Sequence, residues 1–358
     1  MQVKGLRVYA CAVMANGSRR VGIKDVALAA GVSVTTVSHA LNGKGRLPDE
    51  TREHVRRVAL DLGYRPNATA RNLVVGKTGL LALTVSQPDG LPFALSDFAY
   101  FAHLMSAATR AALGHGYALV LTPPNRGLGE AGVEVDGAIV VDPVQGDPVV
   151  DELRESGIPI VTTGRIVGGD ERAPWVDNDH VVGVRSVLAH LERRGARRIA
   201  LLTSPTVLSY TVDVEHAYRD WCARHGMEPL VAHARADLTE SAGFAAAVRL
   251  LDRRDRPDAI FATYDRLALG TLLAAGARGV DVPGDLLLAM TATDSDGARG
   301  GQPAVTALNL YPEQIGRHAA QLLVDLVEGR TPAATQIRVP TRVVARASTR
   351  RAKRPARA

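Results

Sequence analysis

The chain has 358 residues, more than one core of ordinary size holds, so two or three domains are expected. Apolar residues make up 46% of it, yet no apolar run reaches the roughly 18 residues that a membrane helix needs. Only Cys11 and Cys222 are present, which excludes a disulfide framework and predicts a cytoplasmic protein.

The net charge of +6 is unevenly distributed. Residues 1–78 contain 13 lysines and arginines against 5 acidic residues, and residues 346–358 contain six basic residues and no acidic one. The stretch between them is therefore acidic. A basic head on an acidic body suits a protein that binds phosphates at one end.

Residues 1–20 show no clear period and are predicted to be a disordered extension, in which Met14 is an alternative start to Met1. Residues 23–42, IKDVALAAGVSVTTVSHALN, then have the spacing of a helix-turn-helix. Gly31 tolerates the positive φ of the turn, and Ser33 can cap the second helix. The alternative is an ordinary helical hairpin. The first helix carries apolar Val26, Ala27 and Ala30, and the second carries Val34, Val37 and Leu41.

A third helix is predicted over Pro48–Leu62, because apolar residues recur there at i, i+3, i+4 and i+7, with Gly63 closing it. The three helices form a domain over residues 21–65. Residues 66–78 are predicted to be a linker with a short helix that Asn67 caps and that contains Ala70 and Leu73. Such a segment folds when two copies meet on DNA.

From residue 79 to 346, short apolar runs alternate with helical stretches, which predicts an α/β body of parallel sheets in two lobes with a cleft between them. The expected strands are Gly79–Val85, Ala118–Thr122, Gly137–Val141, Ile158–Thr162, Ile199–Thr203, Ala259–Thr263, Leu286–Met290 and Ile337–Val344. The expected helices are Tyr100–Gly114, Val181–Arg194, Ser241–Arg253, Leu267–Ala275 and Pro312–Glu328. Residues 347–358 are predicted to be a disordered basic tail, with weak DNA contact as the alternative.

The motifs of common enzymes are absent from the sequence: there is no G-x-S-x-G, no GxxxxGK[ST] and no H-E-x-x-H. The histidines and the two cysteines show no metal-ligand spacing. No catalytic activity, metal or cofactor is therefore expected. Asp177, Asp179 and His180 form one polar cluster, predicted to cap a helix start, and they stay candidates for binding because ligands lie near the carboxyl ends of strands.

The sequence resembles the lactose/galactose-repressor (LacI/GalR) family of bacterial transcription regulators, from about residue 21 to 349. The blocks that carry the resemblance are IKDVALAAGVSVTTVSHALNGKGRL, ETREHVRRVALDLGYRPNATARNL, VDGAIVV, GIPIVTTGR, VDNDHVVGVRSVLAHLERRGARRIALLT and PDAIFATYDRLALGTLLAA. The family implies a helix-turn-helix head, a hinge helix, and a body like a periplasmic sugar-binding protein that closes on a small effector. It also implies a homodimer or tetramer, and the lack of a C-terminal heptad zipper favours the dimer.

By that resemblance, Val34, Thr35 and His39 contact base edges in the major groove, and Thr36 and Ser38 contact phosphates. Leu73 would wedge between base pairs at the operator centre, the alternative being a core leucine at the junction with the body. The remaining expected DNA contacts are Lys24, Ser33, Asn42, Arg65, Asn67 and Ala70, with Arg52, Arg56 and Arg71 as further phosphate candidates.

Several positions depart from the family pattern. His39 stands where arginine is usual, which alters base preference. In the body, Val214 replaces an arginine that commonly binds sugars, Tyr264-Asp265 replaces an Asn-Asp pair, and Asp265 has helix capping as its alternative role. These losses argue against an ordinary sugar ligand. The expected effector-lining residues are Phe101, Arg165, Asp177, Asn178, Tyr210, Tyr264, Asp265 and Asp294.

The sequence thus predicts an effector-responsive, sequence-specific transcriptional regulator, a repressor that binds a near-palindromic operator as a dimer. The rival from another class is a small-molecule-binding protein of the same body fold whose head no longer binds DNA. A third reading, an enzyme on this body, lacks a catalytic constellation.

Overall fold

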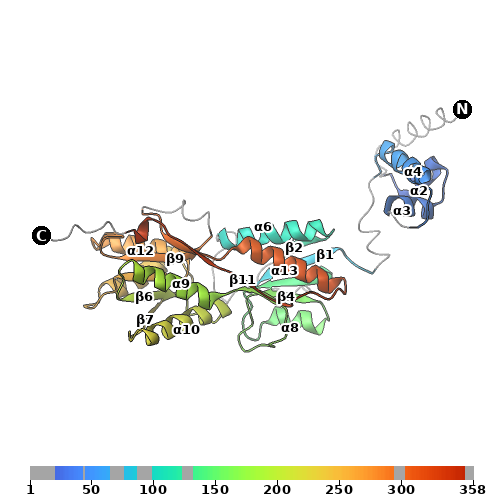
Figure 1. Cartoon of the computed structure of the whole chain (residues 1–358). Coiled ribbons are helices and arrows are strands. Elements are labelled where there is room, and N and C mark those ends of the chain that lie inside the picture. Colours follow the sequence, from blue (N-terminus) through green and yellow to red (C-terminus); the bar gives the residue numbers. More distant parts are fainter. Residues whose placement is uncertain are drawn as a thin grey trace. The chain divides into compact units, whose positions relative to one another are not determined.

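A computed structural model describes residues 21–42, 45–64, 76–86, 99–122, 132–293 and 303–350 (Figure 1). The chain divides into two compact units, Met1–Lys77 and Thr78–Ala358, called here the head and the body. The described ranges leave out the predicted extension 1–20, most of the predicted linker 66–78 and the last eight residues. Within those ranges, no helix is both long and apolar enough to cross a membrane.

The head consists of three helices, α2 (Ile23–Ala30), α3 (Val34–Asn42) and α4 (Asp49–Asp61). Both helix ends that lead into turns close on a glycine with positive φ, Gly31 at 65° and Gly63 at 65°. After each glycine, the backbone N–H of the next residue donates a hydrogen bond to the carbonyl five residues earlier, as Val32 does to Ala27 at 3.0 Å. These bonds give the last carbonyls of each helix a partner. The predicted apolar faces meet in one core, whose fully buried members include Val26, Val37 and Val55.

The first lobe of the body is a six-stranded parallel sheet in the order β11-β5-β4-β3-β1-β2. Its strands are β1 (Leu80–Val85), β2 (Ala118–Leu121), β3 (Gly137–Val141), β4 (Ile160–Thr163), β5 (Trp175–Asn178) and β11 (Gln336–Val339). Leu81 and Leu83 point to the face covered by α6 (Ala99–Gly114) and α13 (Pro312–Val327), and Ala82 points to the face covered by α8 (Pro148–Glu155). This double cover explains why the strands read as continuous apolar runs.

Helices α6 and α13 lie side by side on that lobe (Figure 1). Gly316 of α13 makes the close approach possible, because a Cβ there would overlap the backbone carbonyl of Leu104 in α6.

The second lobe is a six-stranded sheet in the order β12-β10-β9-β8-β6-β7, in which only β12 runs antiparallel to its neighbour. Its strands are β6 (Ile199–Thr203), β7 (Leu230–His233), β8 (Ala259–Ala262), β9 (Leu287–Ala292), β10 (Thr306–Asn309) and β12 (Arg342–Val344). One face packs against α11 (Glu240–Leu251) and α12 (Asp265–Ala277), and the other against α9 (His180–Arg193) and α10 (Ser209–Arg224).

The chain crosses between the lobes three times, after Asn178, at Leu310 and after Val339. Asn178 joins all three crossings, because its side-chain amide donates to the carbonyl of Leu310 at 2.9 Å and to that of Val339 at 3.2 Å. We call these three chain crossings the hinge; they are distinct from the predicted hinge helix within residues 66–78.

Two sequence expectations were wrong here. The single last strand expected over 337–344 is two strands, β11 in the first lobe and β12 in the second, because Pro340 lacks an N–H and the chain changes sheet at that point. The tail expected to be disordered from residue 347 begins with a 3₁₀ turn, Ala347–Thr349. Ser348 there is buried and donates to the Leu288 carbonyl at 2.6 Å, so the turn is part of the second lobe.

The expected α/β architecture of parallel sheets behind a helix-turn-helix head is confirmed. Five elements of the body had no counterpart among the expected strands and helices. They are β5, β7, β10, α8 and α10.

Candidate functional site

The outer face of α3 is the first candidate site. Ser33 caps this helix, because its Oγ accepts the backbone N–H of Thr36 at 3.0 Å and bonds to the Thr36 hydroxyl at 2.8 Å. The next two side chains, Val34 and Thr35, are exposed, with Val34 showing 40% of its surface. The N-terminal turn of α3 therefore presents small side chains, the kind of surface that a major groove admits.

Gly45, which follows α3 in the chain, lies close to the His39 ring. A Cβ at Gly45, whose φ is +75°, would stand 2.6 Å from the ring Nδ1. A side chain at position 45 would therefore displace the imidazole, and the positive φ also favours glycine there.

The other expected DNA contacts divide into residues that the structure describes and residues that it does not. Lys24 is exposed, Ser38 is partly exposed, and Asn42 is the last residue of α3. Arg65, Asn67, Ala70 and Leu73 lie outside the described residues.

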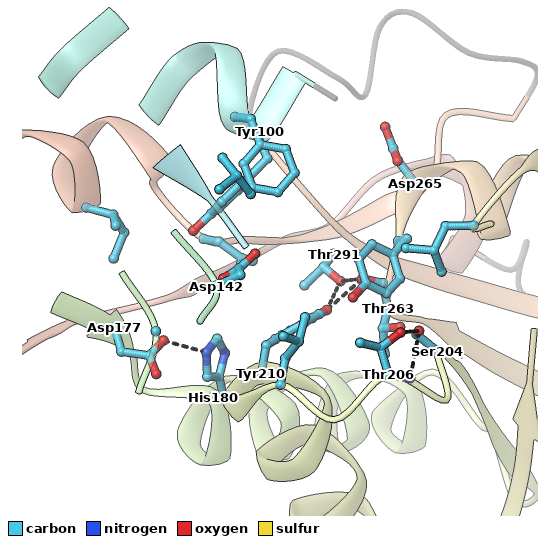
Figure 2. Close-up of a pocket in the computed structure, with 18 of the residues that line it drawn as sticks. Tyr100, Asp142, Asp177, His180, Ser204, Thr206, Tyr210, Thr263, Asp265 and Thr291 are labelled. Atoms are coloured by element: carbon cyan, nitrogen blue, oxygen red, sulfur yellow. Dashed lines mark hydrogen bonds and ion pairs between the residues drawn. The ribbon is translucent and has the colours of Figure 1, made fainter. Parts of the chain in front are cut away.

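The second candidate site is a cavity of about 130 Å³ between the two lobes of the body (Figure 2). It lies at the carboxyl ends of the strands of both sheets, where parallel sheets usually bind ligands. It is lined by Val85, Ser86, Ala99, Tyr100, Phe101, Asp142, Gly164, Val176, Asp177, His180, Ser204, Thr206, Leu208, Tyr210, Leu238, Thr263, Tyr264, Asp265, Thr291, Ala292, Leu310 and Ile315.

Of the eight residues expected to line the cleft, the structure brings five to the cavity wall and directs two elsewhere. The five are Phe101, Asp177, Tyr210, Tyr264 and Asp265. Asn178 points into the hinge, as described above, and Arg165 lies beside the cavity rather than in its wall. Asp294 lies outside the described residues.

Asp265 does not cap α12. It is the first residue of the helix, Tyr264 occupies the cap position without a side-chain bond, and the Asp265 carboxylate accepts the adjacent Arg266 N–H at 2.7 Å. A different helix, α9, has an aspartate cap: Asp179, the residue before its first turn, accepts the Val182 N–H at 3.1 Å.

Asp177 is a fully partnered carboxylate. It accepts the Asn178 N–H at 2.7 Å and the Ser209 hydroxyl at 3.1 Å, and the His180 ring lies 2.8 Å from it. Burial acts to raise the pKa of Asp177, but the His180 ring, these hydrogen bonds and Arg165 outweigh burial, so the pKa is lowered. Asp177 is therefore ionised and occupied by protein groups.

Contacts beside the cavity also join the two lobes. Arg165, which follows β4 in the first lobe, forms an ion pair with Asp213 of α10 in the second lobe. Its backbone N–H donates to Ser209 Oγ at 3.1 Å. The Arg165 guanidinium is thus committed to Asp213 and to Asp177, whose carboxylate is 3.6 Å away.

Asp142, which the sequence reasoning missed, faces the centre of the cavity. It follows β3 with a positive φ of 50°, an uncommon conformation for any residue but glycine. Burial raises the pKa of Asp142, and repulsion from Asp177 raises it further. Attraction from His180 lowers the pKa but does not offset these effects, so the pKa of Asp142 is about 7. The signal that could have found it is its place directly after the predicted strand Gly137–Val141.

The wall from the second lobe is an aromatic and hydroxyl network. Tyr210 donates to the Thr263 carbonyl at 2.6 Å and bonds to the Thr291 hydroxyl (Figure 2). Tyr264 packs edge-on against Tyr210, with ring centroids 5.7 Å apart. Val214, the residue at the family's arginine position, is fully buried in the core beneath this wall.

Comparison with known proteins assigns both units to recognised families. Residues 22–67 match the model of bacterial regulatory proteins of the lacI family, and residues 188–349 match the periplasmic binding protein-like domain. The HTH-type transcriptional regulator CelR of Thermobifida fusca is 34% identical over 341 residues, which cover 92% of this chain and 98% of that protein.

Solved structures agree with this assignment. A CelR–cellobiose complex superposes with a TM-score of 0.68 at 30% identity, over 92% of this chain and all of that one. The lac repressor dimer bound to operator and the anti-inducer ONPF has a TM-score of 0.77 at 22% identity over 92% of this chain and 99% of that one, which supports the fold. These relatives are regulators rather than enzymes, and no cluster of metal-ligating side chains occurs in the described part of this chain. The chain belongs to the lacI family of bacterial regulatory proteins and is a DNA-binding transcriptional regulator.

Proposed function

We propose that the protein is an effector-responsive repressor that binds a near-palindromic operator as a homodimer. The observation that carries the proposal is the combination, in one chain, of a capped helix with exposed Val34 and Thr35 and a cavity whose walls come from two lobes. The first suits base readout in the major groove, and the second suits a ligand whose binding changes the angle between lobes.

The proposed DNA contacts follow from the positions on α3. Val34, Thr35 and His39 read base edges, whereas Lys24, Ser38 and Thr36 contact phosphates. Asn42, Arg65 and the hinge-helix residues Asn67, Ala70 and Leu73 complete the interface, with Leu73 opening the minor groove at the operator centre. A dimer places two heads on half-sites about one helical turn apart. The lac repressor relative, whose structure is described as a dimer on its operator, supports this arrangement.

Ligand binding is proposed to act through the hinge. A molecule in the cavity contacts both lobes, so it stabilises one lobe angle, and the three crossings transmit that angle to the dimer. Coupling of this kind is typically worth about 1–3 kcal/mol in DNA affinity.

The test is a mobility-shift titration of the purified protein against the DNA that flanks its own gene, at low salt. We expect a dimer to bind one symmetric site and to lose affinity by a factor on the order of 10³ between 50 and 200 mM salt, given about six phosphate contacts. If that DNA is not retained at any protein concentration, the proposal of a repressor that binds an operator beside its own gene fails.

A narrower test concerns Leu73→Ala. Loss of the wedge should lower operator affinity more than about tenfold, because the contacts that the kinked DNA permits outweigh the few kcal/mol that unstacking costs. Leu273→Ala is the matched control, since Leu273 is 58% exposed on α12 of the body. Fluorescence anisotropy with labelled operator measures both variants, and equal affinities would contradict the wedge role.

A further inference from the structure

The cavity between the lobes is lined by more acidic than basic side chains. Three carboxylates line it, from Asp142, Asp177 and Asp265, and His180 is the one basic side chain in the described lining. Protein groups already partner Asp177, among them the guanidinium of Arg165, which also pairs with Asp213. An anionic ligand would be repelled here, whereas a cation can pair with the Asp142 carboxylate.

Asp142 is the carboxylate that is open to a ligand. Figure 2 shows it between Tyr100 and His180. Unlike the Asp177 carboxylate, that of Asp142 has no hydrogen-bond partner among the described residues. Its backbone has a positive φ of 50°, a conformation that aspartate adopts more readily than most residues. A partly buried carboxylate in a cavity wall, without a protein partner, is expected where a bound molecule supplies the partner.

His180 also lines the cavity. It is buried, its Nε2 lies 2.8 Å from Asp177, and its Nδ1 has no hydrogen-bond partner among the described residues. The hydroxyl groups of Tyr210, Thr263 and Thr291 already bond to one another, to Thr203 or to the backbone. Asp142 and the Nδ1 of His180 are therefore polar groups that a bound molecule can partner at this end.

Four aromatic side chains line the same cavity. Tyr100 and Phe101 form one edge-to-face pair with centroids 5.4 Å apart, and Tyr210 and Tyr264 form another. Aromatic faces attract cations, an arrangement that proteins use for ammonium groups.

We infer that the cavity binds an organic cation, an amine whose ammonium group pairs with Asp142 in the cavity that Tyr100, Phe101, Tyr210 and Tyr264 also line. A cavity of about 130 Å³ holds on the order of ten water molecules, so the ligand is of comparable size. The inference deepens the proposed function, on which it rests for the role of the ligand as effector.

The test compares amines with neutral molecules of the same shape. Tyramine and 4-(2-hydroxyethyl)phenol are one pair, and D-glucosamine and D-glucose are another; cellobiose, named in the complex of the relative, is added as a neutral sugar. Isothermal titration calorimetry at pH 8 uses the full-length protein without DNA. We expect the amine to bind about tenfold or more tightly than its neutral partner in at least one pair.

Asp142→Asn should abolish that preference, whereas Glu134→Gln should retain it, because Glu134 is exposed near the opposite end of β3. Asparagine tolerates positive φ, so the Asp142 variant is expected to fold, and Asp142→Ser serves as a second variant. The inference is overturned if the neutral members bind as tightly as the amines, if the preference survives in both Asp142 variants, or if no amine binds at about 10 mM.

These outcomes are separate from those of the DNA titration. Amine binding without operator binding would refute the repressor proposal alone, and operator binding without amine preference would refute the cation inference alone.

Discussion

The unpaired carboxylate of Asp142 should destabilise the ligand-free body in a pH-dependent manner. Burial raises the pKa of Asp142 in the folded protein from 3.8 to about 7. Between these values the folded state binds more protons than the unfolded state, so stability falls as the pH rises and levels off above pH 7. Asp142→Asn keeps the shape but carries no charge, so it should be more stable than the parent at pH 8.

The magnitude follows from the size of the shift. A change from 3.8 to about 7 corresponds to about 4 kcal/mol at full value. Because the carboxylate opens into a cavity that admits water, we expect about half of that, about 2 kcal/mol. For a unit of this size the melting temperature should rise by about 4–8 °C at pH 8 and by about a third as much at pH 5.

The groups that face Asp142 could contribute to the same pH range and are therefore part of the design. They are Asp177, His180, Tyr100, Tyr210 and Tyr264. All of them remain in the Asp142→Asn variant, so the difference between the two proteins isolates Asp142.

Thermal unfolding followed by tryptophan fluorescence reports the body alone, because both tryptophans of the chain, Trp175 and Trp221, lie there. Glu134→Gln is the control and should show no pH-dependent gain, since its side chain is exposed. A variant no more stable than the parent at pH 8, or one equally stabilised at both pH values, would refute the reasoning.

Three further predictions concern the scaffold. Asn178→Ala removes two hydrogen bonds from the hinge and should cost the body about 1–3 kcal/mol in urea unfolding; an unchanged midpoint would show that the crossings hold without it. Gly270→Ala places a Cβ against the Glu240 carbonyl between α11 and α12, so it should lower body stability by at least about 1–3 kcal/mol in the same assay, and a neutral result would contradict that packing. Ser33→Ala loses the cap of α3 and should destabilise the head by about 1 kcal/mol in circular dichroism melts, with the body's tryptophan transition unchanged; a shifted body transition would count against independent units.

Apolar periodicity predicted much of the fold, since buried parallel strands must be apolar on both faces. The bounds expected for Gly137–Val141 and Ile199–Thr203 are those of β3 and β6. Strands β5 and β10 were missed because they are four residues long and end in Asn178 and Asn309, whose polar side chains serve the hinge region. A local apolar pattern contains no information on such distant partners.

Sequence placed many site residues in the right loops but could not give the direction of each side chain. Successive strand residues point to opposite sides, so Asp177 faces the cavity and its neighbour Asn178 faces the hinge. Arg165 was expected to contact the ligand, yet the partner that occupies it, Asp213, comes from the other lobe. Such pairing depends on tertiary structure, which one sequence does not reveal.

The interleaved lobes also constrain how the protein assembles during synthesis. Strand β11 completes the first sheet by pairing with β5, and the hydrogen-bonded residues Asn178 and Val339 are 161 positions apart. At about 5–20 residues per second, a ribosome needs roughly 8–30 s to supply β11 after β5 has emerged. During that interval the outer edge of β5 is unpaired and exposes backbone groups that can pair with a strand of another chain.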